Sequence, residues 1–179
     1  MANFALRNIL PDKDSDFNKG VFVILFNVTA IPPHLLLSVD GKIYSITDSG
    51  KQMGSSLEKF LVFIKRKKNP TFFIEWAHLT SLQLDNFSNL TIDVFKKYDR
   101  VVEGKVSCLF PVREVVSKVL GDEMNSANFI FELLPMMEKA NALGKVYQLN
   151  MEELITNGEF ELLTYTNINL REGLQPATL

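Results

Sequence analysis

The first long apolar run of the chain is Val-Phe-Val-Ile-Leu-Phe at positions 21–26. The run is too short for a typical helix and is rich in β-branched and aromatic residues, so it predicts a strand buried on both faces. The ten residues before it are polar and rich in turn formers. We therefore expect residues 1–19 to be a loosely attached arm, residues 20–170 to form one domain, and residues 171–179 to be a frayed tail.

A β-hairpin is predicted over residues 34–47, where Asp40-Gly41 stands between two stretches of β-forming residues. Asp-Gly suits a type I′ turn, because both central positions of that turn need a positive φ. With these two residues as the loop, His34 falls opposite Thr47 in the register of the hairpin.

The remaining elements follow from the helical spacing of apolar residues and from helix caps and stops. They are a loop at 48–54, a helix at 55–65 closed by the basic run 65–68, strands at 71–77 and 90–95, a helix from about Cys108 to Gly121, a helix at 126–143 kinked at Pro135, and a last strand at 159–166. This order predicts the α+β class, with a mostly antiparallel sheet of five or six strands and helices packed on one side and at an end.

Composition and charge exclude several classes of partner. The chain has 179 residues, of which 46% are apolar, which is enough for the core of one domain. Its 19 basic and 21 acidic residues create no positive field that would gather phosphate backbones, so nucleic acid is not an expected partner. We assign the basic run 65–68 to the end of a helix, where cations complement the dipole. The run at 21–26 is far shorter than the roughly 20 residues that cross a bilayer, so no membrane span is expected.

Cysteine and histidine usage limits the chemistry further. Cys108 is the only cysteine, which rules out an internal disulfide and a metal site built on several thiolates. Only two histidines are present, so a multi-histidine metal site is excluded as well. The first residues show no signal-peptide pattern. We expect a cytoplasmic protein that carries no cofactor.

Cys108 and His34 are the residues most suited to catalysis. A thiolate is favoured by the dipole at a helix N-terminus and by a neighbouring imidazolium, and Cys108 lies at the predicted start of a helix. His34 opens a predicted strand directly after two prolines, where its side chain can face a cleft. Such a pair would lower the pKa of the Cys108 thiol below its ordinary value. The alternatives are a buried structural cysteine and a histidine at the rim of the sheet.

A thiol enzyme also needs a polar group that orients the imidazole. Glu75 interrupts an otherwise apolar predicted strand, and its carboxylate needs a polar partner or water. Glu75 either faces His34 and orients it, or is turned outward by strand alternation. Thr47 and Asp48 are the other candidates for this role, whereas the spacing of His78 suggests no partner for it.

The order of these features resembles a known family. A strand at 21–26, a strand that opens with His34, the hairpin Val-Asp-Gly-Lys-Ile-Tyr at 39–44, a helix, and then Cys108 at a helix start resemble the circularly permuted papain-like cysteine hydrolases. That group includes the lecithin:retinol acyltransferase-like enzymes, in which the histidine precedes the cysteine. The resemblance extends over residues 20–121.

The resemblance implies roles for individual residues. Cys108 would be the nucleophile, His34 the general base and later the acid, and backbone N–H groups at the start of the cysteine helix the oxyanion hole. Members of the family carry a histidine or another strongly polar group shortly after the first histidine. This chain offers only Ser45, Thr47 or Asp48 there.

Two functions are therefore expected from the sequence. The first is a cysteine hydrolase or acyltransferase that acts on an amide or ester of a small-molecule or peptide substrate through a covalent acyl-enzyme at Cys108. The second is a non-catalytic binding or inhibitor module, immunity-like, that binds a protein partner in a bacterial cell. A ligand pocket lined by phenylalanine is a weaker third reading, because the 14 Phe residues are better explained as core.

Overall fold

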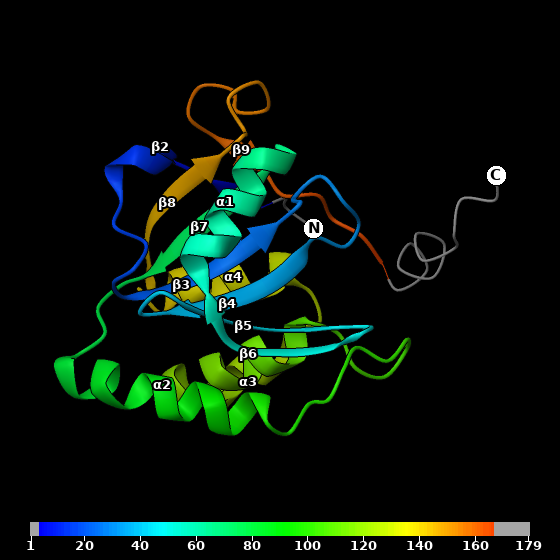
Figure 1. Cartoon of the computed structure of the whole chain (residues 1–179). Coiled ribbons are helices and arrows are strands. Elements are labelled where there is room, and N and C mark those ends of the chain that lie inside the picture. Colours follow the sequence, from blue (N-terminus) through cyan, green and yellow to red (C-terminus); the bar gives the residue numbers. More distant parts are fainter. Residues whose placement is uncertain (1–3, 167–179) are drawn as a thin grey trace.

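The computed structural model describes residues 4–166 (Figure 1). Within these residues the chain forms one α+β domain with four α-helices, a seven-stranded mixed sheet and a separate two-stranded sheet. The predicted fold class is confirmed, and the main sheet is mostly antiparallel as expected. It has more strands than the five or six predicted.

The main sheet is built around a central apolar strand. Its strand order is β2-β8-β7-β3-β4-β5-β6, and all neighbours are antiparallel except the β2–β8 pair. The strands are β2 (Leu10–Pro11), β3 (Val21–Phe26), β4 (His34–Val39), β5 (Lys42–Thr47), β6 (Gly50–Ser56), β7 (Thr71–Trp76) and β8 (Leu143–Leu149). The run at 21–26 is β3, which is buried on both faces as predicted.

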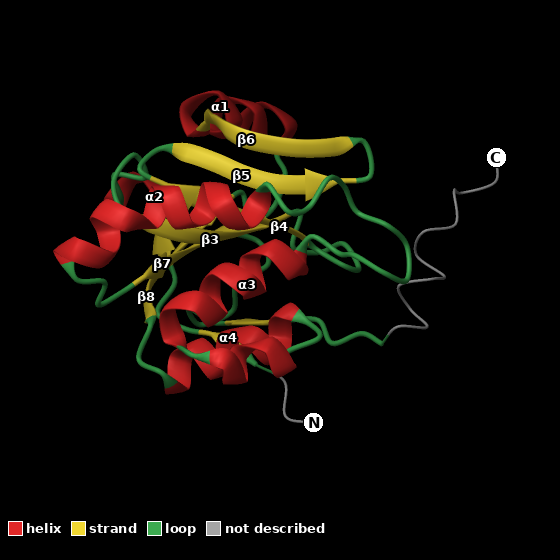
Figure 2. Cartoon of the chain, turned by 90° about the horizontal axis from the view of Figure 1, so that it is seen from below, coloured by secondary structure: helices red, strands yellow, loops and turns green. Residues whose placement is uncertain are grey.

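Helices cover both faces of the sheet (Figure 2). Helix α1 (Leu57–Lys67) packs on one face, where its buried residues join a small core. Helices α2 (Ser81–Phe95), α3 (Leu109–Leu120) and α4 (Ile130–Lys139) pack on the other face and enclose the larger core. The position of α1 differs from the expected arrangement of helices on one side and at an end.

The Asp40-Gly41 hairpin forms as predicted, but its strands separate early. Both loop residues have positive φ, 45° for Asp40 and 73° for Gly41, as a type I′ turn requires. Pairing of β4 with β5 runs from the turn only as far as Leu37 opposite Tyr44. The predicted pairing of His34 with Thr47 is therefore absent, and residues 34–36 leave one edge of β4 open.

The N-terminal residues are part of the domain. Strand β1 (Ala5–Leu6) pairs with β9 (Phe160–Glu161), strand β2 adds to the edge of the main sheet, and Phe17 is buried in the small core. The prediction of a loose arm at 1–19 is thus wrong for residues 4–19. A polar, turn-rich composition does not prevent a segment from packing on the domain. The predicted tail at 171–179 lies outside the described residues.

Three further segments differ from the sequence prediction. Residues 90–95 continue α2, which starts at a Thr80 capping box, because their apolar side chains recur at helical spacing. The loop expected at 48–54 is mostly strand β6, a polar edge strand defined by its pairing with β5. Residues 143–144 begin β8 and do not end a helix, although Pro135 lies inside α4 as expected. No helix among residues 4–166 is long and apolar enough to span a membrane.

Candidate functional site

Cys108 occupies the N-cap position of α3, as the sequence predicted. The helix begins at Leu109, tolerates Pro111 in its first turn and ends before Gly121. Buried side chains along α3 anchor it in the larger core. The position of Cys108 is therefore set by a helix that is well fixed on the sheet.

The Cys108 sulfur is surrounded by backbone amides. The backbone N–H groups of Leu35, Cys108 and Leu109 lie near enough to the sulfur to favour its thiolate form and so act to lower its pKa. Because the Leu35 nitrogen belongs to the peptide bond that follows His34, the sulfur lies next to the backbone of His34. The early separation of β4 from β5 leaves the open edge at which this contact is made. The fold thus brings together two residues that lie 74 positions apart in the sequence.

Burial keeps the Cys108 thiol and the His34 imidazole neutral. Burial raises the pKa of the Cys108 thiol, and the three amide donors, which act in the opposite direction, do not outweigh it. The expectation of a lowered thiol pKa is therefore wrong, because desolvation exceeds the effect of the helix N-terminus. Burial also lowers the pKa of His34, so its imidazole is uncharged at neutral pH and can accept a proton.

The His34 side chain does not contact the thiol through a hydrogen bond in the described part of the chain. His34 lies opposite Phe26 on β3, and strand alternation gives it the same face as Leu36, which packs on the α1 side. Helix α3 packs on the other face. The imidazole would therefore have to turn around the open edge of β4 to reach the Cys108 sulfur.

Glu75 is not placed to orient His34. Its Oε2 accepts a hydrogen bond from the backbone N–H of Lys145 at 3.1 Å, which provides the polar partner that the sequence required. On β3, Glu75 lies opposite Phe22 whereas His34 lies opposite Phe26, four residues further along. This separation corresponds to about 13 Å of strand. Glu75 thus fixes the start of β8 and lies away from the candidate site.

The other proposed orienting residues are engaged in the β5–β6 turn. Thr47 Oγ1 donates to the carbonyl of Gly50 at 3.0 Å, and Asp48 Oδ1 accepts from the Ser49 N–H at 2.8 Å. Ser45 Oγ bonds with Gln52 at 3.1 Å. None of these contacts involves His34. His78 is exposed just beyond β7 and has a φ of 59°.

Tyr165 is a buried residue of the larger core, against which Cys108 also packs, and no role was expected for it from the sequence. Burial raises the pKa of Tyr165, and the charges of Cys108 and Glu132 act in the same direction. Its ring meets those of Phe129 and Phe131 edge-on, with 5.3 and 5.1 Å between the ring centres. These three rings pack against one another in the larger core, against which Cys108 also packs. No sequence signal marks Tyr165, since it lies in a segment that reads as an ordinary strand.

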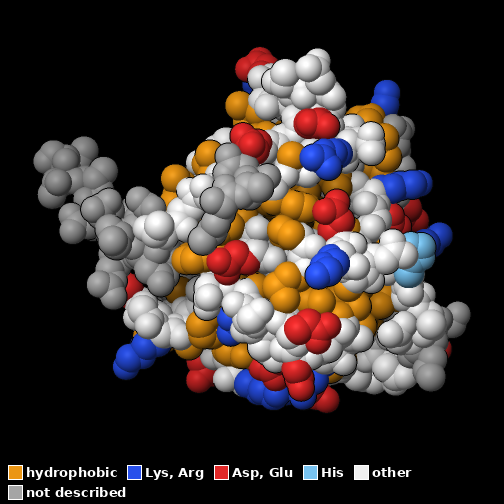
Figure 3. Space-filling model, turned by 180° about the vertical axis from the view of Figure 1, so that it is seen from behind, with side chains coloured by type: hydrophobic (Ala, Val, Ile, Leu, Met, Phe, Trp, Pro, Cys, Tyr) orange, Lys and Arg blue, Asp and Glu red, His pale blue; other side chains and the backbone are white. Residues whose placement is uncertain are grey.

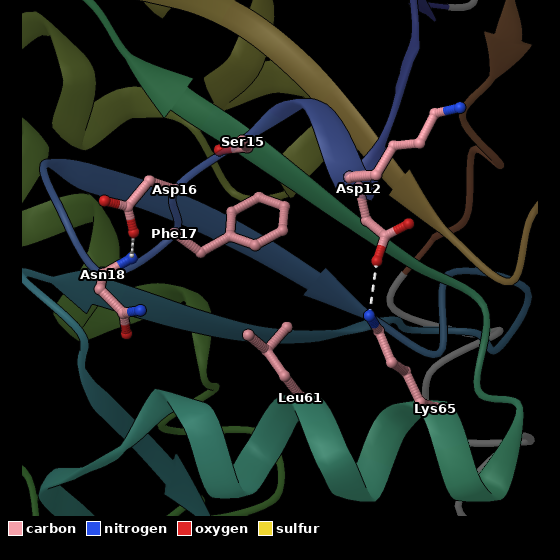
Figure 4. A pocket seen from close by; sticks show the side chains of 8 residues that line it. Asp12, Ser15, Asp16, Phe17, Asn18, Leu61 and Lys65 are labelled. Atoms are coloured by element: carbon pink, nitrogen blue, oxygen red, sulfur yellow. Dashed lines mark hydrogen bonds and ion pairs between the residues drawn. The ribbon is translucent and has the colours of Figure 1, made fainter.

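Two hollows lie elsewhere on the surface. One, of about 240 Å³, runs along α3, and its polar groups bond to each other: Glu114 accepts from Tyr98 at 2.7 Å and pairs with Lys97. The other, of about 290 Å³, lies between residues 12–18 and α1, where Lys65 reaches Asp12 (Figure 4). Among the residues whose side chains are described, no group of three or more histidine, cysteine or acidic residues could hold a metal ion.

Comparisons of the chain with protein-family models, with curated proteins and with solved structures found no match.

Proposed function

We propose that the protein is a cysteine hydrolase or acyltransferase that acts on an amide or ester, with Cys108 as the nucleophile and His34 as the base. One observation supports this most: the Cys108 sulfur lies at the start of α3, against the peptide bond between His34 and Leu35. The two residues are close at the level of the backbone, and the imidazole reaches the sulfur only by turning around the open edge of β4. The order of the two residues also fits the papain-like resemblance.

The reaction would start from a neutral pair. As the Cys108 sulfur attacks the substrate carbonyl carbon, its proton passes to the neutral His34 ring, and the carbonyl oxygen becomes an oxyanion. The N–H groups of Cys108 and Leu109 would donate to that oxygen. Collapse of the intermediate breaks the bond to the leaving amine or alcohol, which takes the proton from His34.

The acyl thioester then reacts with a second nucleophile. His34 takes a proton from water or from an acceptor amine or alcohol, whose oxygen or nitrogen attacks the thioester carbonyl. The bond from the carbonyl carbon to the Cys108 sulfur then breaks, and the sulfur takes the proton back from His34. Water gives hydrolysis, and an acceptor gives acyl transfer. Because burial raises the pKa of the thiol, a base is required in the first step. A reducing compartment such as the cytoplasm would keep the lone thiol free.

The second candidate is a non-catalytic module that binds a small molecule, a peptide or another protein. The observation that favours it is the burial of the Cys108 sulfur together with the absence of a hydrogen bond to His34 among the described residues. In that case Cys108 is a core residue that joins α3 to the open edge of β4.

Trapping of the acyl-enzyme distinguishes the two candidates. The purified chain is mixed with p-nitrophenyl acetate, and intact mass is recorded with the release of p-nitrophenolate. We expect one acetyl group on the wild-type chain, none on Cys108→Ala, and about a hundredfold slower acetylation of His34→Ala, since general-base catalysis contributes at least this much. His78→Ala removes the other histidine and should acetylate at the wild-type rate. Acetylation that persists in Cys108→Ala, or that never occurs on folded wild type, would overturn the proposal.

A further inference from the structure

Helix α1 has an outward face of unusual composition. Leu57 and Ile64 are buried against the sheet, so the residues at i, i+3, i+4 and i+7 from position 59 point away from it. These four residues, called the α1 outer face below, are Lys59, Val62, Phe63 and Arg66. An outward helix face on a globular domain is normally polar, whereas the centre of this one is apolar.

The two apolar side chains of the α1 outer face are truly exposed. Val62 is 62% exposed and Phe63 is 38% exposed. The Phe63 ring is held at the surface by contacts with Phe26 and Phe60, at 6.2 and 6.4 Å between ring centres. The fold does not need these two residues outside, since the buried side of α1 already completes the small core.

Positive charge surrounds this apolar centre. Residues 57–68 contain five basic residues and one acidic residue, a formal charge of +4 in a chain whose total is −2. Among the described side chains only Lys65 of this group forms an ion pair, with Asp12 at 2.7 Å (Figure 4). The face opposite α1 shows basic and acidic side chains interspersed (Figure 3). The helix dipole accounts for cations in the last turn but not for Lys59 near the helix start or for the exposed Val62.

We propose that the α1 outer face docks on the surface of an anionic lipid bilayer. Its unpaired cations would bind anionic head groups, and Val62 and Phe63 would enter the interfacial layer between them. An exposed helix on a sheet presents a convex ridge, which suits a soft, flat surface. Nucleic acid would use the cations but not the apolar centre. This inference concerns the face of the sheet opposite α3 and does not depend on the proposed reaction.

Vesicle co-sedimentation of the full chain tests the proposal. We expect binding to phosphatidylcholine vesicles that contain phosphatidylserine, no binding to phosphatidylcholine alone, and weaker binding when salt rises well above about 0.1 M. A surface cation contributes about fivefold, so Lys59→Gln with Arg66→Gln should weaken binding about 25-fold. Lys105→Gln with Lys145→Gln removes the same charge from exposed positions elsewhere and should weaken it far less.

The apolar part of the face is tested separately. Val62→Ser should weaken vesicle binding several-fold, whereas Leu154→Ser, a 45% exposed control, should not. Poly-glutamate in solution stands in for an acidic protein partner. The proposal would be overturned if the chain bound vesicles of phosphatidylcholine alone as tightly as vesicles that contain phosphatidylserine. It would also be overturned if the Lys59/Arg66 variant bound the phosphatidylserine vesicles as tightly as wild type. Poly-glutamate binding as tight as vesicle binding, with no effect of Val62→Ser on either, would overturn it in favour of an acidic protein.

Discussion

Truncation of Phe17 tests whether the N-terminal segment belongs to the folded domain. Phe17 is 6% exposed, and its ring centre lies 4.3 Å from that of Phe73 and 5.5 Å from those of Phe22 and Tyr147. Truncation of a buried phenylalanine to alanine costs about 3–5 kcal/mol. Because Phe17 lies in a loop that can partly refill the space, we expect Phe17→Ala to lower the free energy of unfolding by about 3 kcal/mol. The thermal midpoint should then fall by about 6–12 °C.

Urea unfolding followed by fluorescence measures this loss. Trp76 is the only tryptophan and is buried in the larger core, so its emission reports unfolding of the domain and not of the segment alone. Phe63→Ala is the matched control, since the ring of Phe63 is 38% exposed, and we expect it to cost about 1 kcal/mol. A loss below about 0.5 kcal/mol for Phe17→Ala would show that the segment is detachable and would refute the reasoning.

Three other substitutions test local features by the same unfolding assay. Ser38→Ala removes a buried hydroxyl that has no hydrogen-bond partner among the described residues and should raise the free energy of unfolding by about 1 kcal/mol; a clear loss would contradict this. Gly41→Ala places a side chain at a φ of 73° and should cost about 1 kcal/mol, and no loss would argue against the type I′ turn. Burial opposes the ionisation of Glu114, but hydrogen bonds from Lys97 and Tyr98 outweigh it and lower the pKa of Glu114 below 4.5. The Glu114 carboxylate therefore stabilises the fold at neutral pH, and this contribution disappears as the pH falls through the lowered value. Glu114→Gln should accordingly be less stable than wild type at pH 7 and equally stable in acid, and a gap that does not change with pH would refute this.

Elements defined by local chemistry were predictable from the sequence. Asp40-Gly41 supplies the positive φ of its turn, Ser56 caps α1, and Pro111 marks the first turn of α3. The strand at 21–26 was predictable because burial on both faces requires a continuous apolar run. In each case the signal lies within a few residues of the element that it defines.

Elements that depend on distant partners were not predictable. Strand β6 is polar and exposed along its length, so only its pairing with β5 defines it. Strand β1 is two residues long and exists because β9, more than 150 positions away, lies beside it. A turn-rich composition before β3 gave no sign that Phe17 enters the core.

In the candidate site, too, features set by the local sequence were predictable and features set by distant parts of the chain were not. The N-cap position of Cys108 follows from the helix signals around it, and its approach to the β4 backbone follows from the fold as a whole. The direction of the pKa shift of the thiol depends on how deeply it is buried, which no motif reveals. The distance between Glu75 and His34 depends on how β7 and β4 pair with β3, which is a long-range property.

Alkylation of Cys108 by iodoacetamide across pH, compared between wild type and His34→Ala, is the most direct test of the proposed pair. The chain has one cysteine, so a single adduct in the intact mass gives the rate without ambiguity. If His34 accepts the thiol proton, the folded wild type should react near pH 7, His34→Ala at least tenfold more slowly, and His78→Ala at the wild-type rate. Burial raises the thiol pKa in both chains, so the labelling midpoint of each should lie above the ordinary value of 9.0, and the effect of His34 should be seen in the rate at pH 7. Equal rates in wild type and His34→Ala, or labelling only after unfolding in urea, would contradict the account.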